Sequence, residues 1–131
     1  MKKNIDNYGR IAGRIWKTLD KYGPLKEIDI IKKLKINKNN FYAGVGWLAR
    51  ENKICKIGSK YQLGETNLGD EIGNNAGKVW NTISTNQNID ISTITEISKI
   101  NIKNAYSALG WLYREDKIQT NTDKEKKFRL K

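Results

Sequence analysis

Lysine, asparagine and tyrosine residues cluster at two places in the sequence, 64 residues apart. The members are Lys38, Asn39, Asn40 and Tyr42 in the first cluster, and Lys103, Asn104 and Tyr106 in the second. Asparagine can pair with adenine through two hydrogen bonds, and lysine can reach guanine or a phosphate. The chemistry that these residue types favour is therefore the recognition of nucleic acid.

Both clusters also have a purely structural interpretation. Asn40 and Asn104 can form local hydrogen bonds at the start of a helix, and Tyr42 and Tyr106 can pack at the edge of a core. For Asn40 the two interpretations have equal weight. For Tyr42 packing is favoured.

The net charge of the chain is +11, from 25 basic and 14 acidic residues, which favours a polyanion: nucleic acid first, an anionic membrane surface second. A lysine-rich solubilising surface is the alternative. The charge is uneven, because residues 1–66 contain 15 basic and 6 acidic residues whereas residues 67–131 contain 10 and 8. We therefore expect the first half to provide most of the affinity, through Lys32, Lys33, Lys35, Lys38, Lys56 and Lys60.

Catalytic and metal-dependent functions find little support. The chain has no histidine, and the single cysteine, Cys55, cannot build a zinc site of the usual Cys/His kind. Gly44-Val45-Gly46 lies inside a predicted helix rather than after a strand, so it is no phosphate-binding loop. We predict that the protein is not an enzyme, has no cofactor or metal and shows no small-molecule ligand. Cys55, between apolar neighbours, is typical of a packed strand thiol.

The elements that position these residues occur twice. Over residues 6–54, the chain repeats itself at an offset of 64 with 19 identities in 49 positions. The copies are expected to drift by one or two residues within 25–35 and 89–99, and the offset becomes 67 after Ile54. Insertions of this kind belong in loops. The chain is therefore a tandem duplication.

Each copy predicts three helices followed by a hairpin. An amphipathic helix over 8–22 carries Ile11, Ile15 and Leu19 and ends at Gly23-Pro24. A short second helix is marked by Ile28, Ile31 and Leu34 in the first copy, and by Ile94 and Ile97 with a Thr93/Glu96 capping box in the second. Asn37 and Asn101 are natural N-caps for third helices over 38–51 and 102–115.

The third helix has a core side and a flat outer side. Phe41, Val45 and Leu48 form the core stripe, echoed by Ala105, Leu109 and Leu112. The outer side carries Asn39, Ala43, Gly46 and Arg50 in the first copy, and Lys103, Ser107, Gly110 and Arg114 in the second. Glycine within a helix costs roughly 1 kcal/mol relative to alanine, so Gly46 and Gly110 indicate a close approach by a phosphate backbone or another helix. Trp47 and Trp111 are expected to fill the core against the first helix, which is favoured over base stacking or a partner-binding patch.

Strands are predicted over 54–57 and 60–63, and over 118–120 and 127–130 around a polar loop. The fold class is therefore mainly α with small β-hairpins (α+β): two tandem winged helix-turn-helix modules. The predicted boundaries are 1–64 for the first module, 65–69 for a short linker and 70–131 for the second module.

The strings IAGRIW, NAGKVW, GWLARENKI and GWLYREDKI are similar to those of a small winged helix-turn-helix family of largely uncharacterised archaeal and bacterial proteins. The resemblance covers both copies and nearly the whole chain, whereas members of the family generally carry one module. It implies the winged-helix fold and a DNA-binding role that follows from that fold.

In such folds the third helix enters the major groove and the wing rests on phosphates. We therefore expect a double-stranded DNA-binding protein, either a transcriptional regulator or a chromatin-like, nucleoid-associated protein. The candidate DNA-binding residues are Lys38, Asn39, Asn40, Tyr42, Arg50, Lys56, Lys60, Lys103, Asn104, Arg114, Lys124, Lys126 and Lys127. The alternative is a protein–protein scaffold of tandem winged helices, as in ESCRT-II subunits.

The sequence also bears on location and assembly. No apolar run approaches the roughly 20 residues that cross a bilayer, and no secretion signal follows the N-terminal Met-Lys-Lys-Asn. A single cysteine fits a reducing compartment, so the expected location is the cytoplasm, at the nucleoid. The sequence leaves open whether the protein forms a homodimer.

Overall fold

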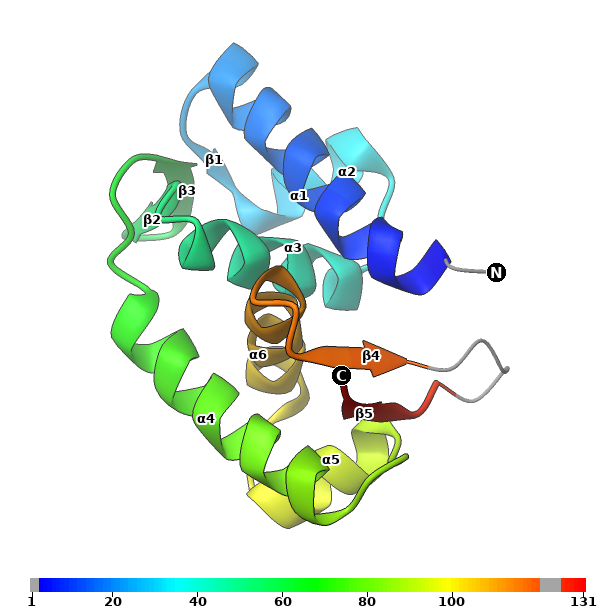
Figure 1. Cartoon of the computed structure of the whole chain (residues 1–131). Helices are drawn as coiled ribbons and strands as arrows, with labels where there is room; N and C mark the ends of the chain where they lie inside the picture. Colours follow the sequence, from blue (N-terminus) through cyan, green and yellow to red (C-terminus); the bar gives the residue numbers. More distant parts are fainter. Residues whose placement is uncertain (1–2, 121–125) are drawn as a thin grey trace.

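The computed structural model describes residues 3–120 and 126–131. The chain folds into two consecutive winged helix-turn-helix modules (Figure 1). The first module comprises α1 (Lys3–Tyr22), β1 (Leu25–Lys26), α2 (Glu27–Leu34), α3 (Lys38–Arg50), β2 (Ile54–Ile57) and β3 (Lys60–Leu63). The second comprises α4 (Gly69–Thr85), α5 (Ile91–Ser98), α6 (Ile102–Arg114), β4 (Ile118–Thr120) and β5 (Phe128–Leu130). The predicted fold class is confirmed.

Helix α1 forms as the apolar spacing predicts, although it begins at Lys3 rather than near residue 8. Ile11, Ile15 and Leu19 are buried along one side. The helix ends where Gly23 takes a φ of +79° and its N–H donates to the Leu19 carbonyl at 2.9 Å. A left-handed residue is a common helix stop, and the following proline cannot continue the helix.

The second helices correct two expectations from the sequence. Helices α2 and α5 begin and end 64 residues apart, so the expected drift between the copies is absent there. Two of the apolar residues expected to mark the core side of these helices do not face the core: Ile28 is 51% exposed and Ile97 is 46% exposed. The side chains that enter the core are Ile30 and Ile94, both at 0% exposure.

Asparagine caps begin both third helices, as predicted. The Asn37 side chain accepts from the Asn40 N–H at 2.7 Å, and the Asn101 side chain accepts from the Asn104 N–H at 2.8 Å. The predicted Thr93/Glu96 capping box of α5 is wrong. The cap is Asp90, whose carboxylate accepts from the Thr93 N–H at 2.9 Å, and this bond lowers the pKa of Asp90.

The wings are antiparallel hairpins, β2 with β3 and β4 with β5. The first begins and ends at the predicted residues. The sequence did not predict β1, which adds a third strand by pairing Leu25 with Tyr61. In residues 69–120 and 126–131, the second module has a single bridge at the equivalent place, between Ile89 and Phe128. A two-residue strand is too short to show a periodic pattern.

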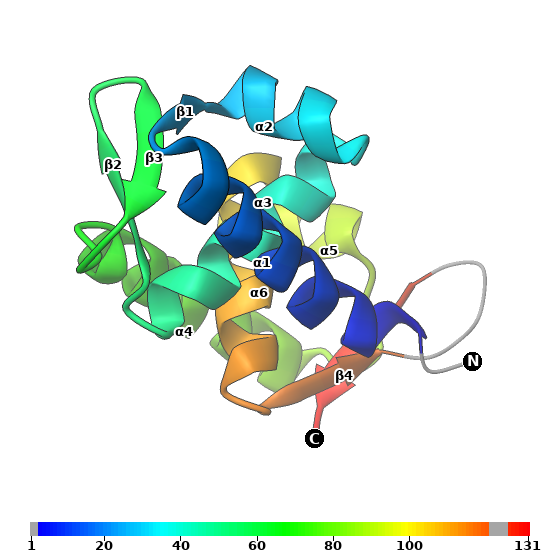
Figure 2. The same ribbon diagram turned by 90° about the horizontal axis from the view of Figure 1, so that it is seen from above.

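Each module has its own core, and the two cores merge at the centre of the molecule. Helices α3 and α6 cross there, with α1 and α4 on the outside (Figures 1 and 2). Trp47, Tyr106 and Trp111 pack against both cores. Ala43 of the first module belongs to the second core, and Ile72 of the second module belongs to the first. The modules therefore share one packed interior.

The segment between the modules is attached to the first wing. The Asn67 side chain accepts from the Lys56 N–H at 2.9 Å and donates to the Lys56 carbonyl at 2.7 Å. The Thr66 N–H donates to the Asn52 side chain at 2.8 Å. These bonds fix the point at which α4 begins relative to β2.

Candidate nucleic-acid interface

The third helices, which would normally read DNA, cross each other in backbone contact. A Cβ atom added at Gly46 would lie 1.9 Å from the Ser107 carbonyl oxygen, and one added at Gly110 would lie 1.8 Å from the Ala43 carbonyl oxygen. Both glycines are buried. The sequence left open whether a phosphate backbone or another helix comes close to these glycines. The structure shows that it is another helix.

This crossing corrects the expected mode of DNA binding. A recognition helix must offer its outer side to the major groove. On α3 that side is occupied by α6, since Ala43 is fully buried, and on α6 it is occupied by α3, since Ser107 is only 6% exposed. Insertion of the outer side of either helix into a groove is incompatible with this arrangement of the modules.

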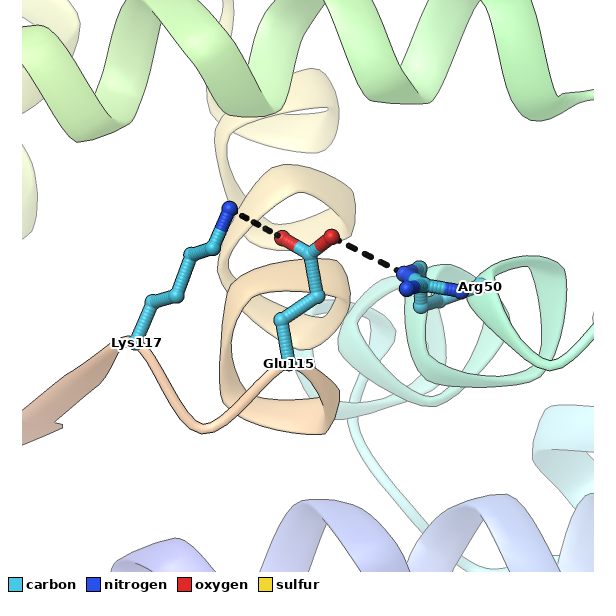
Figure 3. Close-up of polar contacts among 3 residues, drawn as sticks. All are labelled: Arg50, Glu115 and Lys117. Atoms are coloured by element: carbon cyan, nitrogen blue, oxygen red, sulfur yellow. Dashed lines mark hydrogen bonds and ion pairs between the residues drawn. The ribbon is translucent and has the colours of Figure 1, made fainter.

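The two arginines at the ends of these helices take part in the crossing. Arg50 Nε lies 2.9 Å from Glu115 Oε2, and Arg114 Nε lies 2.8 Å from Glu51 Oε2. Figure 3 shows Glu115 between Arg50 and Lys117, whose Nζ lies 3.4 Å from Oε1. The contacts are reciprocal, as expected for a pseudo-two-fold interface. Arg50 and Arg114, proposed from the sequence as DNA contacts, connect the two modules.

The start of α3 remains partly open. Lys38 is exposed, whereas Asn39 and Asn40 are half-buried. Tyr42 is buried, and its hydroxyl donates to Glu27 Oε2 at 2.7 Å. Burial, together with this hydrogen bond, raises the pKa of Tyr42 to about 12. Tyr42 is thus placed as a packing residue, the interpretation that its sequence context favoured.

The start of α6 is exposed to solvent but lies beside the first module. The Lys103 ammonium group is 5.4 Å from the centre of the Tyr42 ring. Asn104 is half-buried and shares a small hollow with Tyr42, Lys56 and Lys103. These residues of the second module are therefore close to the first wing, which the sequence could not predict.

The wings carry the remaining candidate residues. Lys60 is exposed at the tip of the first wing, and Lys56 is half-buried with its ammonium group 5.4 Å from the Tyr61 ring. In the second wing, Lys126 is exposed and Lys127 is half-buried. Lys124 lies outside the described residues.

A basic surface covers α1 and the end of α2, where Lys32, Lys33 and Lys35 were expected from the sequence to provide affinity and the α1 residues were not. Its residues, which we call the α1–α2 basic face, are Arg10, Arg14, Lys17, Lys21, Lys32, Lys33 and Lys35, all exposed. The α1 members recur at steps of three or four residues and so share one side of the helix. The second copy has Asn74, Lys78, Asn81 and Thr85 at the equivalent places of α4.

Three contacts hold this basic face together. Arg14 Nη2 donates to the Leu34 carbonyl at 2.8 Å, which joins α1 to the end of α2. The ammonium groups of Lys33 and Lys21 lie 4.2 Å and 5.2 Å from the centre of the Tyr22 ring. Among the described residues, none of the seven cations is ion-paired with a carboxylate. Their charge is therefore available to an anionic partner.

Comparison with known proteins identifies the type of module. The family model described as winged helix-turn-helix domain (DUF2582) matches the chain twice, over residues 1–63 and 67–130. No curated protein and no solved structure is significantly similar to the chain. In the described part of the chain, no helix is both long and apolar enough to cross a membrane.

Proposed function

Because the chain belongs to the winged helix-turn-helix domain (DUF2582) family, whose fold is typical of DNA-binding proteins, we propose that it binds double-stranded DNA through phosphate contacts. The binding surface consists of the α1–α2 basic face with Lys38 and Lys60 beside it. The observation that carries this proposal is the concentration on one module of exposed cations that have no carboxylate partner within the described part of the chain.

The geometry favours contact with the DNA backbone over contact with bases. Helices α1 and α2 and the β2–β3 hairpin all lie on the side of the molecule seen in Figure 2. Lysine and arginine side chains on such a surface neutralise phosphates and carry no sequence information themselves. The outer sides of α3 and α6, which would read base edges, are covered by each other.

This mode of binding bears on the biological role. A protein that reads phosphates without bases binds many sites with similar affinity. Of the two roles expected from the sequence, it favours the nucleoid-associated protein over the site-specific transcriptional regulator. The proposed location is accordingly the cytoplasm, at the nucleoid.

Fluorescence anisotropy with a labelled random-sequence duplex tests the proposal. If the protein contacts several phosphates, its affinity for the duplex should fall on the order of a hundredfold or more when the salt concentration rises from 50 to 200 mM. A second duplex of unrelated sequence should bind with the same affinity. Absence of binding at 50 mM salt would overturn the proposal.

Matched charge variants of the full chain locate the surface. The triple variant Arg10→Gln, Lys33→Gln, Lys38→Gln removes three positive charges from the proposed surface. Each lost phosphate contact lowers the slope of log affinity against log salt by about 0.9, so the slope should fall by about two to three. The control Lys78→Gln, Lys99→Gln, Arg129→Gln removes the same charge from the second module and should change the slope much less. Equal effects of the two triple variants would contradict the assigned surface.

The covered third helices also favour a second function, a protein–protein scaffold of tandem winged helices. In this molecule both third helices already make protein contacts instead of offering their outer sides to DNA. A scaffold would bind no duplex at low salt and would keep a protein partner at high salt. Self-association stays a prediction, for which sedimentation of the full chain is the test.

A further inference from the structure

Two equivalent hollows open on the surface, one in each module, with volumes of about 310 and 390 Å³. The lining of the Trp16 pocket includes Gly9, Gly13, Trp16, Lys17, Trp47, Glu51 and Lys53. The lining of the Trp80 pocket includes Gly73, Gly77, Trp80, Asn81, Trp111, Glu115 and Lys117. Each lining residue has its counterpart 64 positions away, and together the pockets contain all four tryptophans of the chain.

The pocket walls leave aromatic surface open to solvent. Trp16 is 37% exposed and Trp80 36% exposed, although both carry large apolar rings. A Cβ atom added at Gly13 or Gly77 would meet nothing within 4 Å. Internal packing therefore does not require glycine at these two positions, although glycine within a helix costs about 1 kcal/mol relative to alanine. They keep the hollow beside each exposed ring empty.

The pocket rims carry a net positive charge. Glu51 is ion-paired with Arg114 and Lys53, and Glu115 with Arg50 and Lys117, so each carboxylate faces two cations. Arg50 and Arg114 use only Nε in these pairs, and within the described structure their terminal nitrogens form no hydrogen bond. The Arg50 guanidinium group also lies 5.7 Å from the Trp111 ring. An anionic group beside an apolar group would therefore find donors at the rim.

We propose that each pocket binds a large apolar side chain of a partner polypeptide, flanked in that partner by aspartate or glutamate. Tryptophan and arginine are the residue types that most often dominate the binding energy of protein interfaces. The apolar side chain would contact the two indole rings, and the flanking carboxylates would accept from the free nitrogens of Arg50 and Arg114.

Two observations favour a polypeptide over other occupants. Eight of the nine lining positions are identical in the two pockets, the exception being Lys17 against Asn81, whereas the basic stripe of α1 becomes mostly neutral in α4, where Asn74 also replaces Arg10. A nucleic acid would need that charge beside both pockets. Small-molecule sites usually enclose most of their ligand, whereas these hollows are open at the surface, where Trp16 is 37% exposed and Trp80 36% exposed.

The four indole N–H groups allow a direct test by ¹H–¹⁵N correlation spectra of the full chain. The probe is the capped peptide Asp-Asp-Phe-Asp-Asp, which has no indole signal of its own. All four indole signals should shift and saturate at two peptides per chain. Asp-Asp-Ala-Asp-Asp and Lys-Lys-Phe-Lys-Lys should bind at least about tenfold more weakly, because one lacks the apolar group and the other repels the rim.

Filling each pocket provides the matched variants. In Gly13→Leu the peptide should bind at only one site, with the Trp16 and Trp47 signals unresponsive, and Gly77→Leu should give the converse. The double variant should bind none. Asn74→Leu places the same side chain on α4 outside the pocket and should retain both sites. Urea unfolding checks that these variants fold. We expect them to fold, because leucine is a better helix former than glycine.

Several outcomes would overturn the proposal. These are the absence of indole shifts at millimolar peptide, unchanged binding by the double variant, or equal binding of the acidic and basic peptides. Saturable shifts of all four signals by single-stranded oligothymidine, but not by the peptide, would assign the pockets to nucleic acid instead. The Trp16 pocket shares Lys17 with the α1–α2 basic face, so Gly77→Leu, which fills the pocket of the second module, separates the two proposals: it should lose the Trp80 and Trp111 shifts and leave duplex binding unaffected.

Discussion

Glycines serve opposite purposes at different positions of these helices. Gly46 and Gly110 are buried where two helix backbones touch, and each has a carbonyl oxygen in the space that a Cβ atom would need. Gly13 and Gly77 are exposed, with open space beside them. The first pair is required by packing and the second pair is not.

This difference predicts opposite effects of one substitution. Gly46→Ala should destabilise the protein by more than about 3 kcal/mol, because a Cβ atom 1.9 Å from the Ser107 oxygen forces the helices apart. Gly13→Ala should raise the free energy of unfolding by about 0.5–1 kcal/mol, since alanine favours the helix. Urea unfolding followed by circular dichroism measures both. Similar effects at the two positions would contradict the helix crossing.

At the residue scale the sequence predicted much of the structure but not the partners of its residues. It indicated that Gly46 and Gly110 face a close neighbour, and that Asn37 and Asn101 cap helices. The identity of the neighbour depends on how the modules are oriented, which no local pattern encodes. The same applies to Arg50, whose partner Glu115 is 65 residues away.

The central element is the crossing of α3 and α6. Its middle is apolar and closely packed, and its ends are closed by reciprocal arginine–glutamate pairs. The arginine side chains are 45% exposed, whereas the glutamate side chains are only 18% and 15% exposed. The pairs are therefore partly shielded from solvent and should be stronger than fully exposed pairs.

A double-mutant cycle on Arg50 and Glu115 tests this interaction. Either alanine substitution should lower the free energy of unfolding, and the coupling between them should be about 0.5–1 kcal/mol and smaller in 1 M salt. Arg14 with Glu115, which the structure does not pair, is the control cycle and should show no coupling. A coupling near zero for Arg50 and Glu115 would mean that the pair does not contribute to the crossing.

At the element scale the predictions succeeded where a pattern was long enough. Third helices, their caps and the first wing were located to within a residue or so. Strand β1 was missed because two residues show no alternation. The phase of α2 was misjudged because several apolar residues lie close together in it, and only tertiary packing decides that Ile30 and not Ile28 is buried.

The whole molecule behaves as one unit because its two cores share Trp47, Tyr106 and Trp111. A separated first half would expose the apolar outer side of α3. That surface is nearly self-complementary, since the contacts in the full chain are reciprocal.

We therefore predict that residues 1–66 alone form a homodimer in which Arg50 and Glu51 pair across the interface. Analytical ultracentrifugation should show a dimer at high concentration and loss of structure on dilution, because the fold depends on the contact. Gly46→Leu in this fragment should abolish the dimer. A stable, folded monomer at micromolar concentration would contradict the shared core.

The arrangement of the modules was the least predictable feature of the molecule. Local patterns determine helices, caps and wings, whereas the orientation depends on contacts between residues more than 60 positions apart. The candidate site changed for this reason: the lysines of the first module remain available, but the outer sides of both third helices do not.

The pseudo-two-fold crossing has a consequence for symmetry. Joining two modules in one chain raises their effective concentration to the millimolar range or above, so the pairing does not depend on how much protein is present. In a dimer of identical chains every basic residue would occur twice, on opposite flanks. Here most of the excess positive charge lies on one flank, since the first 66 residues carry 15 basic and 6 acidic residues and the rest carry 10 and 8. Fusion thus combines a symmetric helix crossing with two modules of unequal charge. A homodimer of the first half could not have this asymmetry.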